Sequence, residues 1–186
     1  NVNGTSQVGG LVGSNARSSA DNDAIIQNSA AFGDVTGETN VGGLVGSNDN
    51  SGIIRTTEAS GTVNGTETVG GLIAVNNGTV RNSTVSSSLT GEFSVGGIVG
   101  DNEVAGDIRN TTASGRITAT GDFASNIGGL VGVSDGTVQN ATALGNVIAP
   151  TADEVGGLVG EHNGGIIQNT VAAGNVSGNR TVGGLV

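Results

Sequence analysis

The sequence predicts an all-β protein, a β-solenoid of about six coils with three short parallel strands in each coil. The first observation behind this prediction is a phrase, Val-Gly-Gly-Leu-Val-Gly, that recurs almost unchanged at intervals of 26 to 33 residues. Its copies begin at Val8, Val41, Val69, Val95, Ile127, Val155 and Val182. Repeats of this length indicate one supersecondary unit stacked on copies of itself. The second observation is a composition of 36 glycines and three phenylalanines in 186 residues, which favours a thin aliphatic core repeated along an axis.

Each unit carries three apolar patches, and we expect one strand from each. The first patch is the recurring phrase. The second centres on an Ile or Val two residues before an Asn, as in Ile26 and Asn28, and the third reads Ala-x-Gly-x-Val, as in Ala31–Gly33–Val35. Apolar residues spaced by two indicate β-strands. The Gly, Asn, Asp and Thr between the patches are turn formers.

The apolar columns distinguish the inside of the solenoid from the outside. The position of Ile26 is Ile or Val in every unit, so it should point inward. Strict alternation then places the Asn two residues later inward as well, as a structural ladder of stacked amides. This predicted ladder consists of Asn28, Asn82, Asn110, Asn140 and Asn169, with Thr56 interrupting it. A second polar column follows the first patch and holds Asn15, Asn48, Asn76, Asn102, Ser134 and His162.

The leucine of the recurring phrase leaves two alternatives. If Val8 and Val12 both point inward, strict alternation sends Leu11 and its equivalents outward, where they would form a lateral docking face. Alternatively, the Gly-Gly pair bends the strand and resets the alternation, so that the leucines are buried.

The chain starts and stops in the middle of a repeat unit, so residues 1–186 are interpreted as one solenoid segment of a longer array. Terminal coils expose strand edges, which template pairing with another chain. We therefore expect further repeats or other copies of the same protein as partners, associating end to end.

Charge and composition exclude several classes of function. The net charge is −10, and all six basic residues are Arg. This balance disfavours nucleic acid as a partner. It resembles the composition of proteins from salt-loving organisms. Without cysteine there are no disulfides, thiolate metal sites or cysteine nucleophiles, and without a long apolar run no membrane insertion is expected within the segment.

The Gly-Gly-Leu-Val-Gly phrase at this repeat length resembles the GLUG-motif repeats, and the resemblance covers essentially the whole chain. Such repeats occur in large surface proteins, including filamentous-haemagglutinin-like adhesins, and beside the catalytic domain of IgA-specific metallopeptidases. The resemblance implies an extracellular, cell-surface location and an adhesive or stalk-like role. The peptidases carry a His-Glu-x-x-His zinc motif, which this chain lacks, so peptidase activity does not carry over.

No residue pattern predicts catalysis or a cofactor. His162 has no second His or Cys at a known spacing and is interpreted as structural. Acidic turns offer weak candidates for calcium, which prefers clustered oxygen ligands: Asp21, Asp23, Asp49, Asp101 and Glu103. Sequons in turns make Asn3, Asn64, Asn77 and Asn179 candidates for glycosylation, whereas those at Asn82, Asn110 and Asn140 should be inaccessible in the inward column.

The sequence therefore predicts a structural or adhesive extracellular protein, a segment of a surface fibre or stalk without enzymatic activity. Its partners would include cell-surface or matrix components. The alternative is a non-catalytic repeat region of a large secreted enzyme such as a metallopeptidase. A carbohydrate-binding module is disfavoured because such modules usually stack sugars on aromatic rings, and the chain has no Trp or Tyr.

Overall fold

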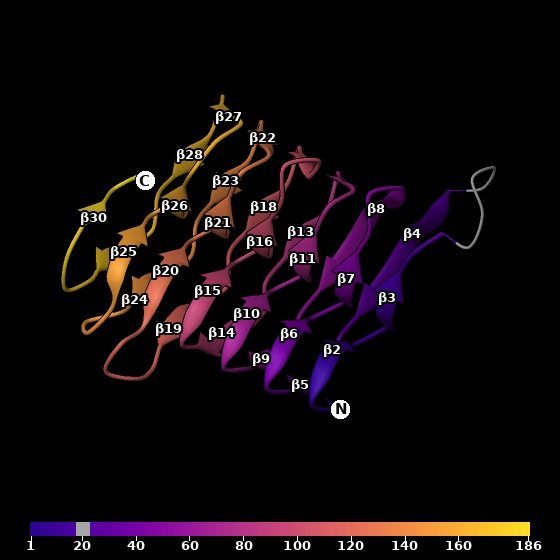
Figure 1. Ribbon diagram of the computed structural model, residues 1–186, viewed down its shortest axis with the longest axis horizontal. Helices are drawn as coiled ribbons and strands as arrows, with labels where there is room; N and C mark the ends of the chain where they lie inside the picture. The colour runs from indigo at the N-terminus through magenta and orange to yellow at the C-terminus, as the bar shows by residue number, and fades with distance from the viewer. Residues whose placement is uncertain (18–22) are drawn as a thin grey trace.

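The chain folds into a flattened rod of stacked coils, described by a computed structural model for residues 1–17 and 23–186 (Figure 1). All strand pairs are parallel, and each strand pairs with its counterpart in the next coil. The recurring valines lie in register, because Val69 pairs with Val41 on one side and Val95 on the other. The fold class predicted from the sequence, a β-solenoid of about six coils, is confirmed.

Four sheets run along the rod, which we name A to D. Sheet A contains β1 (Val2–Asn3), β5 (Val35–Thr36), β9 (Thr62–Asn64), β14 (Ser88–Gly91), β19 (Ile117–Ala119), β24 (Val147–Ile148) and β29 (Val176–Ser177). Sheet B contains β2 (Ser6–Gly9), β6 (Thr39–Gly42), β10 (Glu67–Gly70), β15 (Phe93–Gly96), β20 (Ser125–Gly128), β25 (Asp153–Gly156) and β30 (Val182–Gly183). Sheet C contains β3 (Val12–Asn15), β7 (Val45–Asn48), β11 (Ile73–Asn76), β16 (Val99–Asn102), β21 (Val131–Ser134) and β26 (Val159–His162).

Sheet D is wider than the others. It begins with two long strands, β4 (Ala24–Ala31) and β8 (Gly52–Ala59), which pair with each other. In the later coils each long strand is replaced by two short ones. These are β12 (Thr79–Arg81) with β13 (Thr84–Val85), β17 (Asp107–Arg109) with β18 (Thr112–Ala113), β22 (Thr137–Gln139) with β23 (Thr142–Ala143), and β27 (Ile166–Gln168) with β28 (Val171–Ala172). We number the coils 1 to 6 by their sheet C strands, from β3 to β26.

The expected three strands per coil are too few, because two of the three apolar patches each contain a bend. The Gly-Gly pair divides the first patch between sheets B and C, and the Ala-x-Gly-x-Val patch turns from sheet D into sheet A. At the Gly-Gly bend, a Cβ on Gly42 would lie 1.9 Å from the carbonyl oxygen of Val45, and a Cβ on Gly43 would lie 2.2 Å from that of Gly71. No side chain fits at either position, so glycine is required in both.

This bend decides the position of the leucines. Leu44 has no exposed surface, and neither do its equivalents in coils 3 to 6. Leu11, in the first coil, is about half exposed, with 49% of its surface accessible. The Gly-Gly pair therefore resets the alternation, and the exposed leucine face is not formed.

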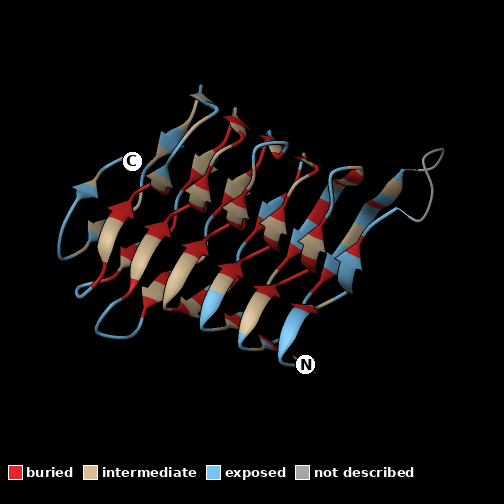
Figure 2. Ribbon diagram, in the orientation of Figure 1, coloured by how far each residue is buried: buried red, intermediate tan, exposed pale blue. Residues whose placement is uncertain are grey.

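The core consists of two clusters that follow the length of the rod (Figure 2). One lies between sheets C and D and contains Leu44, Val45, Ile54 and Ala59 from coil 2. The other lies between sheets A and B, where Val41 and Val63 are representative. Sheets C and D thus enclose one cluster, and their outer faces point away from each other.

Candidate functional site

A ladder of buried amides runs through the corner between sheets C and D. Asn15, Asn48, Asn76 and Asn102 occupy the last position of successive sheet C strands and are almost completely buried. The Nδ2 atoms of Asn15, Asn48 and Asn76 each donate to the Oδ1 of the next residue along the ladder, at distances of 2.8, 2.9 and 2.8 Å. Each Nδ2 also donates to a nearby backbone carbonyl, such as that of Gly78 for Asn76. The ladder therefore satisfies a row of polar groups inside the core.

The ladder ends at Ser134, which occupies the same position in coil 5. Its hydroxyl is buried, and it makes no hydrogen bond with any described part of the chain. The serine side chain is shorter than asparagine and does not continue the row. His162, in coil 6, pairs with Ser134 along the sheet and lies exposed near the end of the rod.

The asparagine column that the sequence predicts to point inward points outward instead. Asn28, Asn82, Asn110, Asn140 and Asn169 are all exposed, as is Thr56. Each has a positive φ, between 50° and 54°. A single left-handed residue breaks the alternation of side chains, and Asn tolerates this conformation better than most residues. Between neighbouring members of this column, only Asn110 donates to Asn82, at 3.1 Å, so it forms no continuous ladder.

The outward position also changes the expectation for the sequons. Asn82, Asn110 and Asn140, expected to be inaccessible, lie on the surface. Of the four glycosylation candidates, Asn3 and Asn179 are exposed, whereas Asn64 and Asn77 are half-buried. Their modification remains a prediction.

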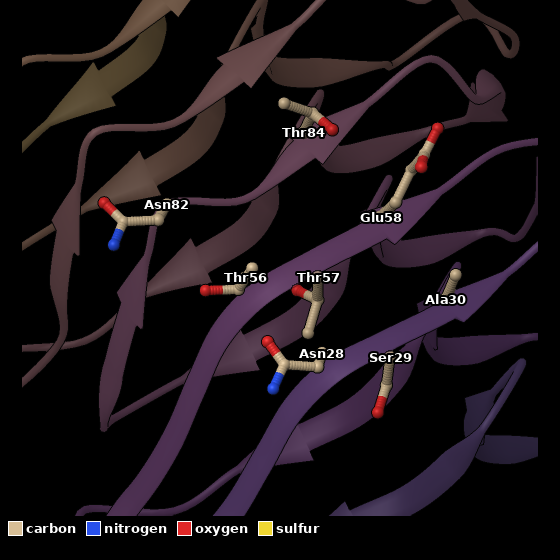
Figure 3. Close-up of a pocket in the computed structure, with 8 residues that line it drawn as sticks. All are labelled: Asn28, Ser29, Ala30, Thr56, Thr57, Glu58, Asn82 and Thr84. Atoms are coloured by element: carbon tan, nitrogen blue, oxygen red, sulfur yellow. The ribbon is translucent and has the colours of Figure 1, made fainter.

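A shallow groove crosses sheet D at this left-handed corner (Figure 3). Asn28, Thr56 and Asn82 line it from three successive coils, together with Glu58 and Thr84. The lining offers hydroxyls, amides and a single carboxylate. These groups can form hydrogen bonds with a ligand, but they do not form a nucleophile and base pair.

The calcium candidates do not converge on one site within the described residues. Asp21 lies outside the described ranges, and Asp23 and Asp49 are exposed outside the strands. No group of three or more His, Cys, Asp or Glu side chains in residues 1–17 and 23–186 is placed to hold a metal ion. Burial raises the pKa of Asp101 to about 6, and the nearby charges of Glu103 and Asp135 contribute further.

A column of basic residues on the outer face of sheet D was not anticipated from the sequence. Arg55, Arg81 and Arg109 pair in register on β8, β12 and β17. Glutamines occupy the same column in the flanking coils: Gln27, Gln139 and Gln168. The signal was present in the repeat, since each of these residues directly precedes a member of the exposed Asn column.

The three arginines of this column differ in their hydrogen-bond and ion-pair partners. The Nε of Arg109 lies 2.7 and 2.8 Å from the two carboxylate oxygens of Asp107. The Nε of Arg55 donates to Oε1 of Gln27 at 2.9 Å. The guanidinium of Arg81, between them, has no side-chain hydrogen bond or ion pair with any residue that the structure describes.

The fold and its columns define the chain as a parallel β-solenoid built from one repeated unit. Residues 91–118, about one coil, match the family model of the GLUG motif. The other coils repeat the same phrase in register with this unit, which supports a relationship of the whole array to the GLUG-motif repeats. No curated protein matches the chain. No solved structure matches it either. Among the described residues, no helix is long and apolar enough to cross a membrane.

Proposed function

We propose that the chain is a structural segment of an extracellular surface fibre or stalk, without catalytic activity of its own. The observation that carries this proposal is the continuity of the four parallel sheets, whose strands keep their register from coil to coil. Each coil is joined to the next by hydrogen bonds in every sheet and by shared core packing. Such a rod holds its two ends at a fixed separation, as a spacer must.

The extracellular and adhesive parts of the proposal rest on surface chemistry and on the family. The net charge of −10, with no Lys, gives a strongly hydrated surface. The GLUG resemblance implies surface proteins. Under this proposal, cell-surface or matrix components are the partners, the exposed sequons carry glycan where the host glycosylates, and no cofactor is needed.

A second candidate function is a non-catalytic repeat region of a large secreted enzyme, such as a metallopeptidase. The GLUG motif favours it, because such repeats flank catalytic domains in the IgA-specific peptidases. A zinc motif elsewhere in the same gene would support this alternative over the fibre.

The location can be tested with antibodies raised against residues 1–186 and applied to intact cells of the source organism. Labelling of unpermeabilised cells supports the proposal, and labelling only after permeabilisation contradicts it. Deleting the repeats from the gene then separates the two candidates. Loss of cell attachment with no loss of secreted peptidase activity supports the fibre, whereas retained attachment with altered peptidase activity supports the enzyme.

A further inference from the structure

Two faces of the rod carry charges of opposite sign, and of the residues discussed below only Arg109 is in an ion pair within the described part of the chain, with Asp107. On the outer face of sheet D, Arg55, Arg81 and Arg109 are stacked on consecutive coils, and neighbouring strands in a sheet lie only about 4.8 Å apart. Like charges directly opposite one another on neighbouring strands are destabilising. Although the chain has 16 acidic residues, Arg81 has no ionic partner among the described residues.

The outer face of sheet C and its following turn carry the opposite imbalance. We define the acidic strip as Asp101 and Glu103 on coil 4, Asp135 on coil 5 and Glu161 on coil 6. Asp101 lies in register between Val75 and Val133, and its pKa is raised to about 6 by burial and by the charges of Glu103 and Asp135. None of these four carboxylates forms an ion pair with a residue in the described ranges.

From these two faces we propose that copies of this chain associate side by side, with the Arg column of one rod against the acidic strip of the next. Sheets C and D enclose the same core cluster, so the outer face with the Arg column and the outer face with Asp101 and Glu161 point in opposite directions, while Glu103 and Asp135 lie in the turns between the two sheets. One rod can therefore bind a neighbour on each side. Such a head-to-tail contact does not close on itself, and it generates layers or bundles instead of a dimer.

The positions of the charges along the rod match. The Arg column occupies coils 2, 3 and 4, and the acidic strip occupies coils 4, 5 and 6. Because both partners are the same solenoid, their coils have the same spacing. Antiparallel rods displaced by one coil from full overlap place coil 3 opposite coil 5, and so do parallel rods displaced by two coils. In both arrangements Arg81 of one copy faces Asp135 of the other.

The observations favour a second copy over an acidic polysaccharide as the partner. Either one must overcome repulsion from the net negative rod. In a second copy, the carboxylates of Asp101, Glu103 and Asp135 already repel one another, and the charges have the same spacing as the Arg column because both follow the same coils. Contact therefore reduces the repulsion among the stacked arginines and the repulsion among the carboxylates of the acidic strip. The inference concerns the faces of the rod and holds whether the chain serves a fibre or an enzyme.

Exchanging the charges at positions 81 and 135 tests the proposal. Self-association of the variants is measured by sedimentation velocity at about 0.01 M NaCl, where the Debye length is about 30 Å. Arg81→Glu and Asp135→Arg should each weaken association about tenfold. An equimolar mixture of the two should associate within about twofold of wild type, because each variant supplies the charge that the other lacks. Arg116→Glu, which changes the same charge on an exposed residue outside both faces, is the control for net charge.

Neutral variants show whether weaker association comes from the lost charge or from a misfolded protein. Arg81→Gln and Asp135→Asn introduce side chains that the same columns already hold at Gln139 and Asn77, so the circular dichroism spectrum should be unchanged while association weakens. Association should also be lost at about 1 M NaCl, where the Debye length is about 3 Å. End-to-end association through strand edges would instead increase with salt and would not change when residue 81 is substituted.

Three results would overturn the proposal. The first is a wild-type protein that stays monomeric at low salt. The second is an Arg81→Glu variant that associates as strongly as Arg116→Glu, and the third is a mixture that associates no better than its two components. Arg81-dependent binding of polygalacturonate by a wild-type protein that does not self-associate would assign the Arg column to an acidic polysaccharide instead.

Discussion

Asn76 donates from Nδ2 to Oδ1 of Asn102, 2.8 Å away in the next coil, and neither side chain has exposed surface. The same amide accepts a hydrogen bond from Asn48 on its other side, at 2.9 Å. Each asparagine in the middle of the ladder thus acts as both donor and acceptor, and removing one leaves two neighbours unsatisfied.

Asn76→Ala should lower the free energy of unfolding by about 3 kcal/mol, because buried polar groups without a partner cost about 1–3 kcal/mol each. Ser134→Asn should act in the opposite direction and raise it by about 1 kcal/mol. Its turn, Ser134–Gly136, has the same length as Asn76–Gly78, so the longer side chain has a template in coil 3. Urea unfolding measures both effects.

Asn77→Ala is the matched control for the ladder. Asn77 is adjacent to Asn76 but only half-buried, and its substitution should change stability by less than about 0.5 kcal/mol. Equal losses for Asn76→Ala and Asn77→Ala would show that the amide ladder contributes nothing specific.

Thr56→Asn should stabilise the protein by about 1 kcal/mol. Thr56 has a φ of 54°, and a β-branched residue is strained in the left-handed region. Asn28 and Asn82 adopt the same conformation in the neighbouring coils, so the substitution extends an existing pattern. Thr84→Asn, on the same sheet but without a positive φ, should bring no gain in thermal stability. A gain in stability at Thr84 equal to that at Thr56 would show that relief of backbone strain is not the cause.

Asp101→Val should raise stability at pH 7 and change its dependence on pH. The folded pKa of Asp101, about 6, lies above its unfolded value near 3.8, so the folded state holds the proton more tightly. Asp101 therefore favours folding below about pH 4, and this contribution is lost as the pH rises through about 6. Because Asp101 is only partly buried, we expect a gain of about 1 kcal/mol at pH 7.

The measurement for Asp101 is the difference in unfolding free energy between wild type and Asp101→Val, followed from pH 4 to pH 7. Valine already occupies this column at Val75 and Val133, so packing is preserved. The difference should grow as the pH rises, and a difference independent of pH would contradict the raised pKa.

Thermal stability should rise with NaCl. Sixteen acids against six bases repel one another along a narrow rod. Raising NaCl from about 0.1 M to 1 M shortens the Debye length from about 10 Å to 3 Å. Melting curves recorded at low protein concentration, where rods are separate, should show a higher Tm at high salt. Asp135→Asn combined with Glu161→Gln should reduce this dependence, and a Tm that does not respond to NaCl would contradict the electrostatic argument.

The periodic part of the fold was predictable from the sequence. Val41, Val69 and Val95 recur at one position of the repeat, and each is buried in the same cluster. The local dihedral angles were not predictable by alternation. Asn82 follows the buried Val80 by two residues, yet it points outward because its own φ is positive.

For the polar and charged columns, too, the sequence predicts the periodic alignment but not the orientation of the side chains. Asn76 and Asn102 were recognised as a column, but no spacing rule showed that this column, and not that of Asn82, carries the buried ladder. The alignment of Arg81 with Arg55 could be found by superimposing the repeats. That Arg81 lacks an ionic partner among the described residues could not be found in this way, because it depends on where the acidic side chains of the folded rod point.

Backbone nuclear Overhauser effects would show whether the chain is a parallel solenoid whose coils stack in register. We expect cross-strand contacts from Val41 to Val69 and from Val69 to Val95, with equivalent contacts in all four sheets. Contacts between sequence-adjacent strands running antiparallel, as in hairpins, would contradict this architecture.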